Sequence, residues 1–78
     1  MESIFILRAE GKGYCQDQYI VGKENAWSQW CFMQKYYDRQ NIEVKVYSTF
    51  ITSFGRIERY EEKDPMMLMP NSNYALAE

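Results

Sequence analysis

The amino-acid sequence predicts an α+β fold: a small antiparallel sheet of about four strands with one long helix packed across it, in the chain order ββαββ. Three observations lead to this fold class. One segment has apolar residues at helical spacing, a few short segments have the composition of strands, and the glycine pattern typical of a βαβ unit is absent from the sequence. In a chain of 78 residues we expect one domain over 1–64, followed over 65–78 by an irregular C-terminal extension that is methionine-rich and then polar.

Two strands are expected before the helix. The first includes Ile4 to Leu7, a continuous apolar run that is too short for a helix. The second covers 14–21, where the apolar residues gather only at the end. Between them, Glu10-Gly11-Lys12-Gly13 supplies the two glycines that a tight hairpin turn needs for positive φ angles. We therefore expect a hairpin turn between these strands.

The helix is predicted from Lys23 or Glu24 to about Arg39, with Glu24 at its positive end and Lys35 and Arg39 toward its negative end. Projected at about 100° per residue, its apolar side chains cover well over half of the circumference. They form a central stripe and two flanks: Ala26, Trp30, Met33 and Tyr37 in the stripe, with Trp27, Cys31, Phe32 and Tyr36 beside it. One sheet face covers only part of such a helix, so something else must cover the rest.

Two more strands are expected after the helix. Residues 42–50 alternate between apolar and polar side chains, which predicts a half-buried strand, and 56–62 is β-rich after a bend near 53–55. The partner of this last strand is left open by the sequence. Asp64-Pro65 is expected to stop regular structure, and 70–73 has the composition of a turn or tail.

The composition excludes several classes of function. The chain has no histidine, which removes Ser-His and Cys-His nucleophilic pairs and histidine zinc sites. Its net charge of −2 offers no general attraction to nucleic acid or to anionic membranes. No apolar run approaches the length of a membrane span, and no signal-peptide pattern is recognisable. We expect a cytoplasmic, non-enzymatic protein with Cys15 and Cys31 reduced, no metal, no cofactor and no membrane partner.

The leading hypothesis is a small protein-binding module. Bulky aromatic side chains beyond those that one sheet can hide are typical interface anchors, and methionine adapts to irregular surfaces. The predicted interface consists of the helix flank and the methionine-rich segment: Trp27, Phe32, Tyr36, Met66, Met67 and Met69. The partner is another protein of unknown identity, and a homodimer is also expected. By size and composition, such a chain is like viral accessory or inhibitor proteins that block a host protein by surface contact. Alternatively, the methionine segment folds back over the helix.

A second hypothesis is a nucleotide or single-stranded nucleic-acid binding module. Basic and aromatic residues interleave in the last two predicted strands, as they do on sheets that stack bases and hold phosphates. The residues concerned are Lys45, Tyr47, Arg56, Arg59 and Tyr60. Nearby glutamates would cancel most of the positive field, and a solvated strand face with charge pairs explains the same pattern.

Overall fold

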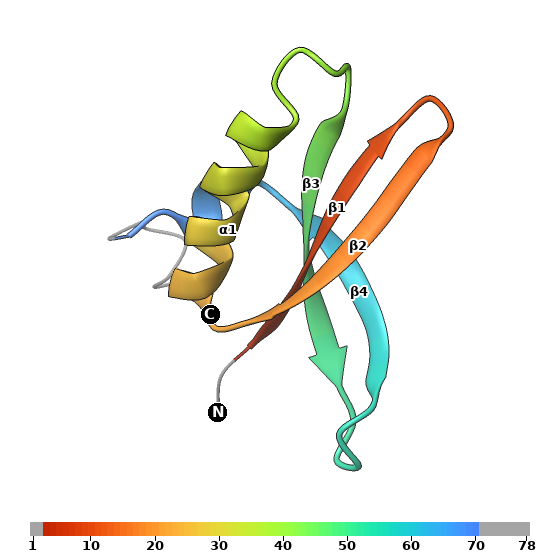
Figure 1. The fold of residues 1–78 in the computed structure, drawn as a ribbon. Coiled ribbons are helices and arrows are strands. Elements are labelled where there is room, and N and C mark those ends of the chain that lie inside the picture. Colours follow the sequence, from red (N-terminus) through yellow and green to blue (C-terminus); the bar gives the residue numbers. More distant parts are fainter. Residues whose placement is uncertain (1–2, 71–78) are drawn as a thin grey trace.

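The computed structural model describes residues 3–70 and shows one helix lying against one face of a twisted four-stranded sheet (Figure 1). The elements are β1 (Ile4–Gly11), β2 (Tyr14–Val21), α1 (Lys23–Tyr36), β3 (Glu43–Ile51), β4 (Ile57–Lys63) and a 3₁₀ turn, η1 (Pro65–Leu68). The strand order across the sheet is β2-β1-β3-β4, and all neighbours are antiparallel. The predicted α+β class and ββαββ order are confirmed, and the last strand pairs with the one before it.

The β1–β2 hairpin turns at Lys12-Gly13, where Gly13 has a φ of +75°. Gly11 is required for a different reason, because a Cβ there would lie 2.9 Å from the carbonyl oxygen of Asn41. β2 has the predicted bounds, and β1 includes the predicted apolar run and continues beyond it to Gly11. Pairing with β2 and β3 extends the strand through Arg8 and Glu10, which the apolar pattern alone did not include.

Helix α1 begins directly after Gly22, which has a φ of +91°, and ends at Tyr36. The prediction that it continues to about Arg39 is wrong. Arg39 and Asn41 have left-handed backbone conformations, with φ angles of 67° and 55°, and these reverse the chain into β3. Left-handed residues cannot continue a right-handed helix.

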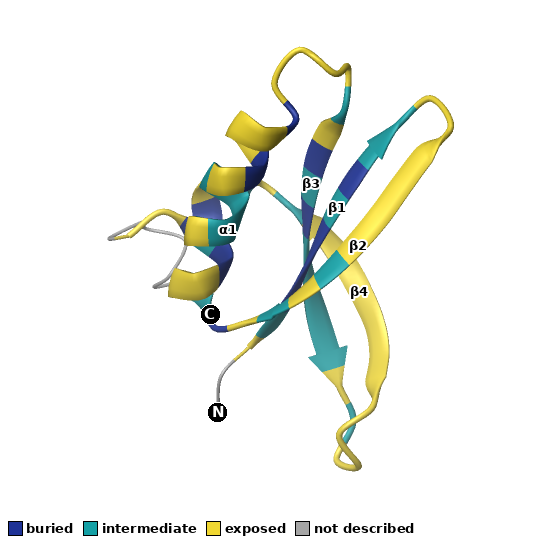
Figure 2. Cartoon of the chain, viewed as in Figure 1, coloured by how far each residue is buried: buried dark blue, intermediate teal, exposed yellow. Residues whose placement is uncertain are grey.

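The core lies between α1 and the sheet face that it covers (Figure 2). Its buried side chains come from all parts of the fold except β2 and β4: Phe5, Leu7 and Ala9 of β1, Ala26 and Met33 of α1, Tyr37, Val44 and Val46 of β3, and Met67 and Leu68 of η1. Because alternate residues of a strand face opposite sides, the register places Ile6, Arg8, Tyr47 and Tyr60 on the sheet face away from α1. We call this second side the open face.

The segment after β4 belongs to the domain. The Asp64 side chain accepts a hydrogen bond of 2.9 Å from the Met66 backbone N–H, which starts η1. Met67 and Leu68 then pack against α1 in the core. The expected end of regular structure at Asp64-Pro65 is therefore wrong, and the hydrophobic core extends past the predicted boundary at 64. The rest of the predicted tail, 71–78, lies outside the described residues.

Candidate interaction surfaces

The C-terminal half of α1 presents two large aromatic side chains to solvent. Phe32 and Tyr36 are 57% and 60% exposed. They are four residues apart, so they lie on the same side of the helix, and their rings stack with centroids 5.9 Å apart. Tyr14, at the start of β2, is also exposed and lies across from them. We call Tyr14, Phe32 and Tyr36 the aromatic surface.

Buried Tyr37 supports the aromatic surface from below. Its ring meets Tyr36 and Tyr14 edge-on, with centroid distances of 4.8 Å and 5.8 Å. The Tyr14 hydroxyl donates to Oε1 of Gln16 at 2.6 Å, and its oxygen lies 2.9 Å from the Tyr37 hydroxyl, which can donate to it. This hydrogen bond with Tyr14, together with burial, raises the pKa of Tyr37 to about 12. Burial, two ring contacts and this hydrogen bond hold the Tyr37 side chain in place beneath the aromatic surface.

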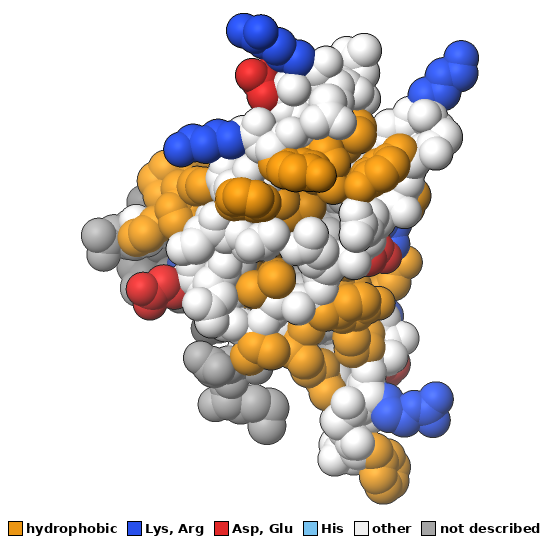
Figure 3. All heavy atoms as spheres, viewed as in Figure 1, with side chains coloured by type: hydrophobic (Ala, Val, Ile, Leu, Met, Phe, Trp, Pro, Cys, Tyr) orange, Lys and Arg blue, Asp and Glu red, His pale blue; other side chains and the backbone are white. Residues whose placement is uncertain are grey.

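A shallow hollow of about 200 Å³ lies between α1 and β2 at this place. It is lined by Tyr14, Gln16, Gln18, Phe32, Met33, Tyr36 and Tyr37. Figure 3 shows hydrophobic side chains gathered on this side of the molecule. The hollow is smaller than the roughly 300 to 1,000 Å³ of typical small-molecule sites.

The other predicted interface residues are not part of the aromatic surface. Trp27 stacks on Trp30, with centroids 5.5 Å apart, and is half-buried against the core. Met67 is buried, so it offers no surface to a partner. Met66 and Met69 are exposed, at 38% and 41%, but they belong to η1 and its cap.

That methionine segment lies near the opposite end of the helix. Leu68 and Pro70 share a hollow with Lys23 and Glu24, which are in the first turn of α1. The aromatic surface, in contrast, is at the C-terminal half. Of the predicted interface, the structure brings together only Phe32 and Tyr36, and it adds Tyr14, which sequence reasoning missed. Tyr14 is adjacent to the hairpin turn, and only the packing of α1 against β2 relates it to the helix.

The open face carries a polar network centred on Arg8. The Arg8 guanidinium donates to both carboxylate oxygens of Asp17, at 2.7 Å and 3.1 Å, and to the Tyr60 hydroxyl at 3.4 Å. It also lies over the rings of Tyr47 and Tyr60, 5.0 Å and 5.6 Å from their centroids. The hydrogen bond from Arg8 lowers the pKa of Asp17, and the same bond raises the pKa of Arg8. Sequence reasoning missed both charged residues, although the register of a two-residue hairpin at Lys12-Gly13 pairs them.

The five residues of the nucleic-acid hypothesis do not form one surface. Lys45, Tyr47 and Tyr60 share the open face, but Arg59 is on the other side of the sheet, 3.8 Å above the ring of Phe50. Arg56 precedes β4 in the turn.

The charges of the open face also do not favour phosphate binding. Lys45 is paired with Glu10 at 2.7 Å, which raises the pKa of the lysine, and Arg8 is neutralised by Asp17. The acids that the register places on this face outnumber its two bases: Glu10, Asp17, Glu43 and Glu62. A face with this charge balance repels a polyanion.

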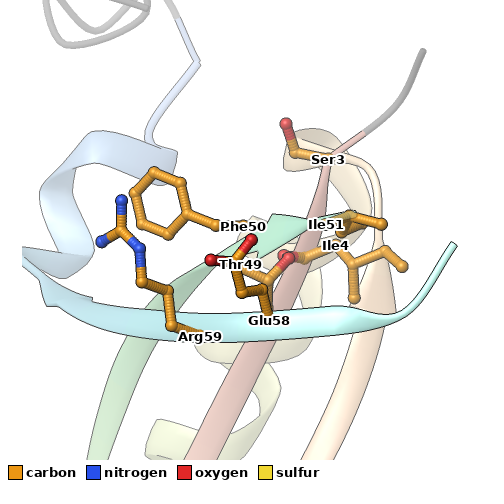
Figure 4. Close-up of a pocket in the computed structure, with 7 residues that line it drawn as sticks. All are labelled: Ser3, Ile4, Thr49, Phe50, Ile51, Glu58 and Arg59. Atoms are coloured by element: carbon orange, nitrogen blue, oxygen red, sulfur yellow. The ribbon is translucent and has the colours of Figure 1, made fainter. Parts of the chain in front are cut away.

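A third hollow, of about 450 Å³, opens where β3 ends and β1 and β4 begin (Figure 4). Its lining is Ser3, Ile4, Thr49, Phe50, Ile51, Glu58 and Arg59. The Thr49 hydroxyl is used internally, since it donates to the Ile4 carbonyl at 2.7 Å. The other polar side chains of the lining are Ser3, Glu58 and Arg59, and the Arg59 guanidinium lies over the Phe50 ring.

Residues 3–70 contain no cluster of three or more side chains suited to holding a metal ion. The same part of the chain contains no helix long and apolar enough to cross a membrane. Comparison with known protein families, with characterised proteins and with solved structures finds no match to this chain.

Proposed function

We propose that this protein is a non-enzymatic protein-binding module and that the aromatic surface is its recognition site. One observation carries the proposal: Phe32 and Tyr36 are stacked on each other, more than half exposed, and held on a helix above the buried Tyr37. Two large apolar rings are unfavourably exposed to water, so a partner that covers them gains favourable free energy from their burial.

The arrangement has the features of an interface anchor. The two rings are already ordered by their neighbours, so binding costs little side-chain entropy. The Tyr36 and Tyr14 hydroxyls and the Gln16 side chain supply polar groups around the apolar centre. An apolar centre with polar groups at its rim is the usual structure of a protein interface. A module of this kind acts by occupying the surface of its partner, as an inhibitor does, and needs no reactive group.

Photo-crosslinking tests the proposal. The photoreactive amino acid p-benzoylphenylalanine would replace Phe32 in the cells that produce the protein, and a matched sample would carry it at Phe54. Phe54 is 90% exposed and lies in the β3–β4 turn, away from the aromatic surface. We expect a discrete crosslinked protein from position 32 and none of that mass from position 54. Equal crosslinking from the two positions would contradict the proposal.

The partner identified in this way allows a binding measurement. Truncation of an interface anchor costs about 2 kcal/mol or more, which is about 30-fold in affinity. Phe32→Ser should therefore weaken binding by about 30-fold, whereas Phe54→Ser should leave it unchanged. Thermal unfolding of both variants verifies that the difference is not caused by loss of the fold.

A further inference from the structure

The two edge strands of the sheet differ in how they are protected from pairing. In β4, five of the seven residues are charged: Glu58, Arg59, Glu61, Glu62 and Lys63. In β2 the only charged residue among eight is Asp17, which Arg8 neutralises. β2 contains no proline, and its register with β1 runs without a bulge. Charge, proline and bulges are the usual means by which proteins keep an edge strand from pairing, so β4 is protected and β2 is open to another strand.

The hairpin register shows which backbone groups of β2 are available. The two-residue turn makes Gly11 and Tyr14 a hydrogen-bonded pair, so the even-numbered residues of β2 direct their backbone groups toward β1. The Gly22 N–H continues this pattern, because it donates to the Ser3 carbonyl at 2.8 Å. The other backbone N–H and C=O groups point away from β1, and they belong to the odd-numbered residues Cys15, Asp17, Tyr19 and Val21. The Val21 carbonyl points the same way and already accepts a hydrogen bond of 2.9 Å from the Asn25 side chain, so a partner strand would use the second lone pair of this oxygen.

We propose that β2 pairs with β2 of a second copy of this chain, antiparallel and across a two-fold axis at Gln18. In this register, Asp17 of each copy faces Tyr19 of the other, and Cys15 faces Val21. All four outward-facing residues then have partners, and an acid faces a phenol rather than another acid. A two-fold axis at Asp17 would place two carboxylates opposite each other, and one at Tyr19 would leave Cys15 without a partner in the strand. The strand is thus self-complementary in one register.

The remaining edges explain why the assembly would stop at a dimer. Once the two β2 strands pair, the continuous sheet ends in β4 on both sides, and the charges of β4 discourage further addition. Because the two-fold axis is perpendicular to the sheet, both helices lie on the same face. The hollow beside each aromatic surface is lined by Gln16 and Gln18 of β2, so in this dimer the two aromatic surfaces lie close to the axis, on the side of the joined sheet that the helices cover.

An engineered disulfide tests the register. In a Cys15→Ser, Cys31→Ala background, Gln18→Cys would place two cysteines opposite each other across the axis, with Cα atoms about 4.5 Å apart, within the range of about 4.4 to 6.8 Å for disulfides. Gln16→Cys is the matched control, because position 16 faces Ile20 of the second copy. We expect mild oxidation to give a covalent dimer for Gln18→Cys and a monomer for Gln16→Cys. No dimer, or equal dimer from both variants, would overturn the proposal.

Oligomeric state provides the second measurement. The wild-type protein should show a concentration-dependent dimer by sedimentation, and Tyr19→Pro should weaken the dimer by about tenfold or more. Proline at position 19 removes an outward N–H and leaves the bonds to β1 in place. If the wild-type protein stays monomeric at about 1 mM, the dimer proposal is refuted. The same conclusion follows if β2 pairs with a foreign peptide but not with a second copy of the chain.

The dimer proposal and the proposed recognition site can be refuted independently of each other. Tyr19→Pro should still crosslink its partner protein from position 32, because the Tyr19 side chain is on the open face, whereas Phe32 and Tyr36 are on the side of the sheet that α1 covers. If Tyr19→Pro does not fold, as circular dichroism would show, the comparison of Gln18→Cys with Gln16→Cys decides the proposal.

Discussion

Two neighbouring residues of β1 show how differently the two faces of the sheet are closed. Leu7 and Ile6 are both almost inaccessible to solvent, at 0% and 1% exposure. Leu7 lies in the core beneath α1. Ile6 is on the open face, where no helix covers it in residues 3–70, and it lies between Tyr19 and Tyr47 of the adjacent strands. Leu7 is buried by apolar packing under α1, whereas Ile6 is buried to the same extent by long amphipathic side chains on the open face.

This difference has an energetic consequence. Side chains around Leu7 are held between two elements and cannot move far when space opens, whereas Tyr19 is 59% exposed and can relax toward a gap. The cost of removing a buried side chain depends on how far its surroundings collapse. A domain with a single helix can thus have one rigid face and one adaptable face.

The largest expected effect comes from the core. Leu7→Ala should lower the free energy of unfolding by about 3 to 5 kcal/mol, and Ile6→Ala by only about 2 to 3 kcal/mol, because the open face partly fills the cavity. Urea unfolding followed by tryptophan fluorescence measures both. Equal costs for the two variants would mean that the two faces are equally rigid.

A smaller effect is expected for Arg8, whose side chain is 21% exposed. Arg8→Ala removes the ion pair with Asp17 and the contacts with two tyrosine rings, at a cost of about 1 to 2 kcal/mol. Arg56→Ala is the matched control in the β3–β4 turn and should cost less than about 0.5 kcal/mol. If the two arginine variants are equally stable, the network does not stabilise the open face.

The ion pair between Arg8 and Asp17 makes the stability of the open face depend on pH. The pKa of Asp17 is lowered below 3.8 by its hydrogen bond from Arg8, so its stabilising contribution is present above that value and is lost as the pH falls through the folded-state pKa. Between about pH 5 and pH 2, the wild type should lose more stability than Asp17→Asn. Asp38→Asn, which changes an exposed acid, should follow the wild type. Parallel curves for the wild type and Asp17→Asn would contradict this assignment.

The smallest effect is expected at Phe54, which is 90% exposed in the β3–β4 turn. Phe54→Ala should change the free energy of unfolding by less than about 0.5 kcal/mol, because the ring buries little surface in the folded chain. Thermal unfolding is sufficient to measure it. A larger loss would show that this ring has a contact in solution that the fold alone does not provide.

Much of the fold was predictable because local chemistry determines it. The hairpin at Lys12-Gly13, the single helix after Gly22 and the alternation in β3 each depend on residues close together in the sequence. The end of α1 was not predictable in this way. Only Tyr37 continues the apolar stripe past Tyr36, and the basic Arg39 suits the negative end of a helix. The return of the chain into β3 instead places Arg39 and Asn41 in left-handed conformations.

The interaction surface was predicted only in part. The surplus of aromatic side chains on the helix was evident, and Phe32 and Tyr36 are exposed as that surplus required. Sequence reasoning also placed Met67 in the interface, although it is buried. Spacing along one helix tells which side chains share a face, but not which of them η1 will cover.

The sequence by itself determined the order of elements, the positions of the turns and the excess of large rings on the helix, because these follow from the residue types and their spacing. Tertiary structure decided which rings are buried, which charges pair and which edge strand is open. Those properties depend on contacts between residues far apart in the chain, as in Arg8 with Tyr60 or Tyr14 with Tyr37. Such contacts arise only when the twist and register of the sheet are set, and local pattern does not encode them.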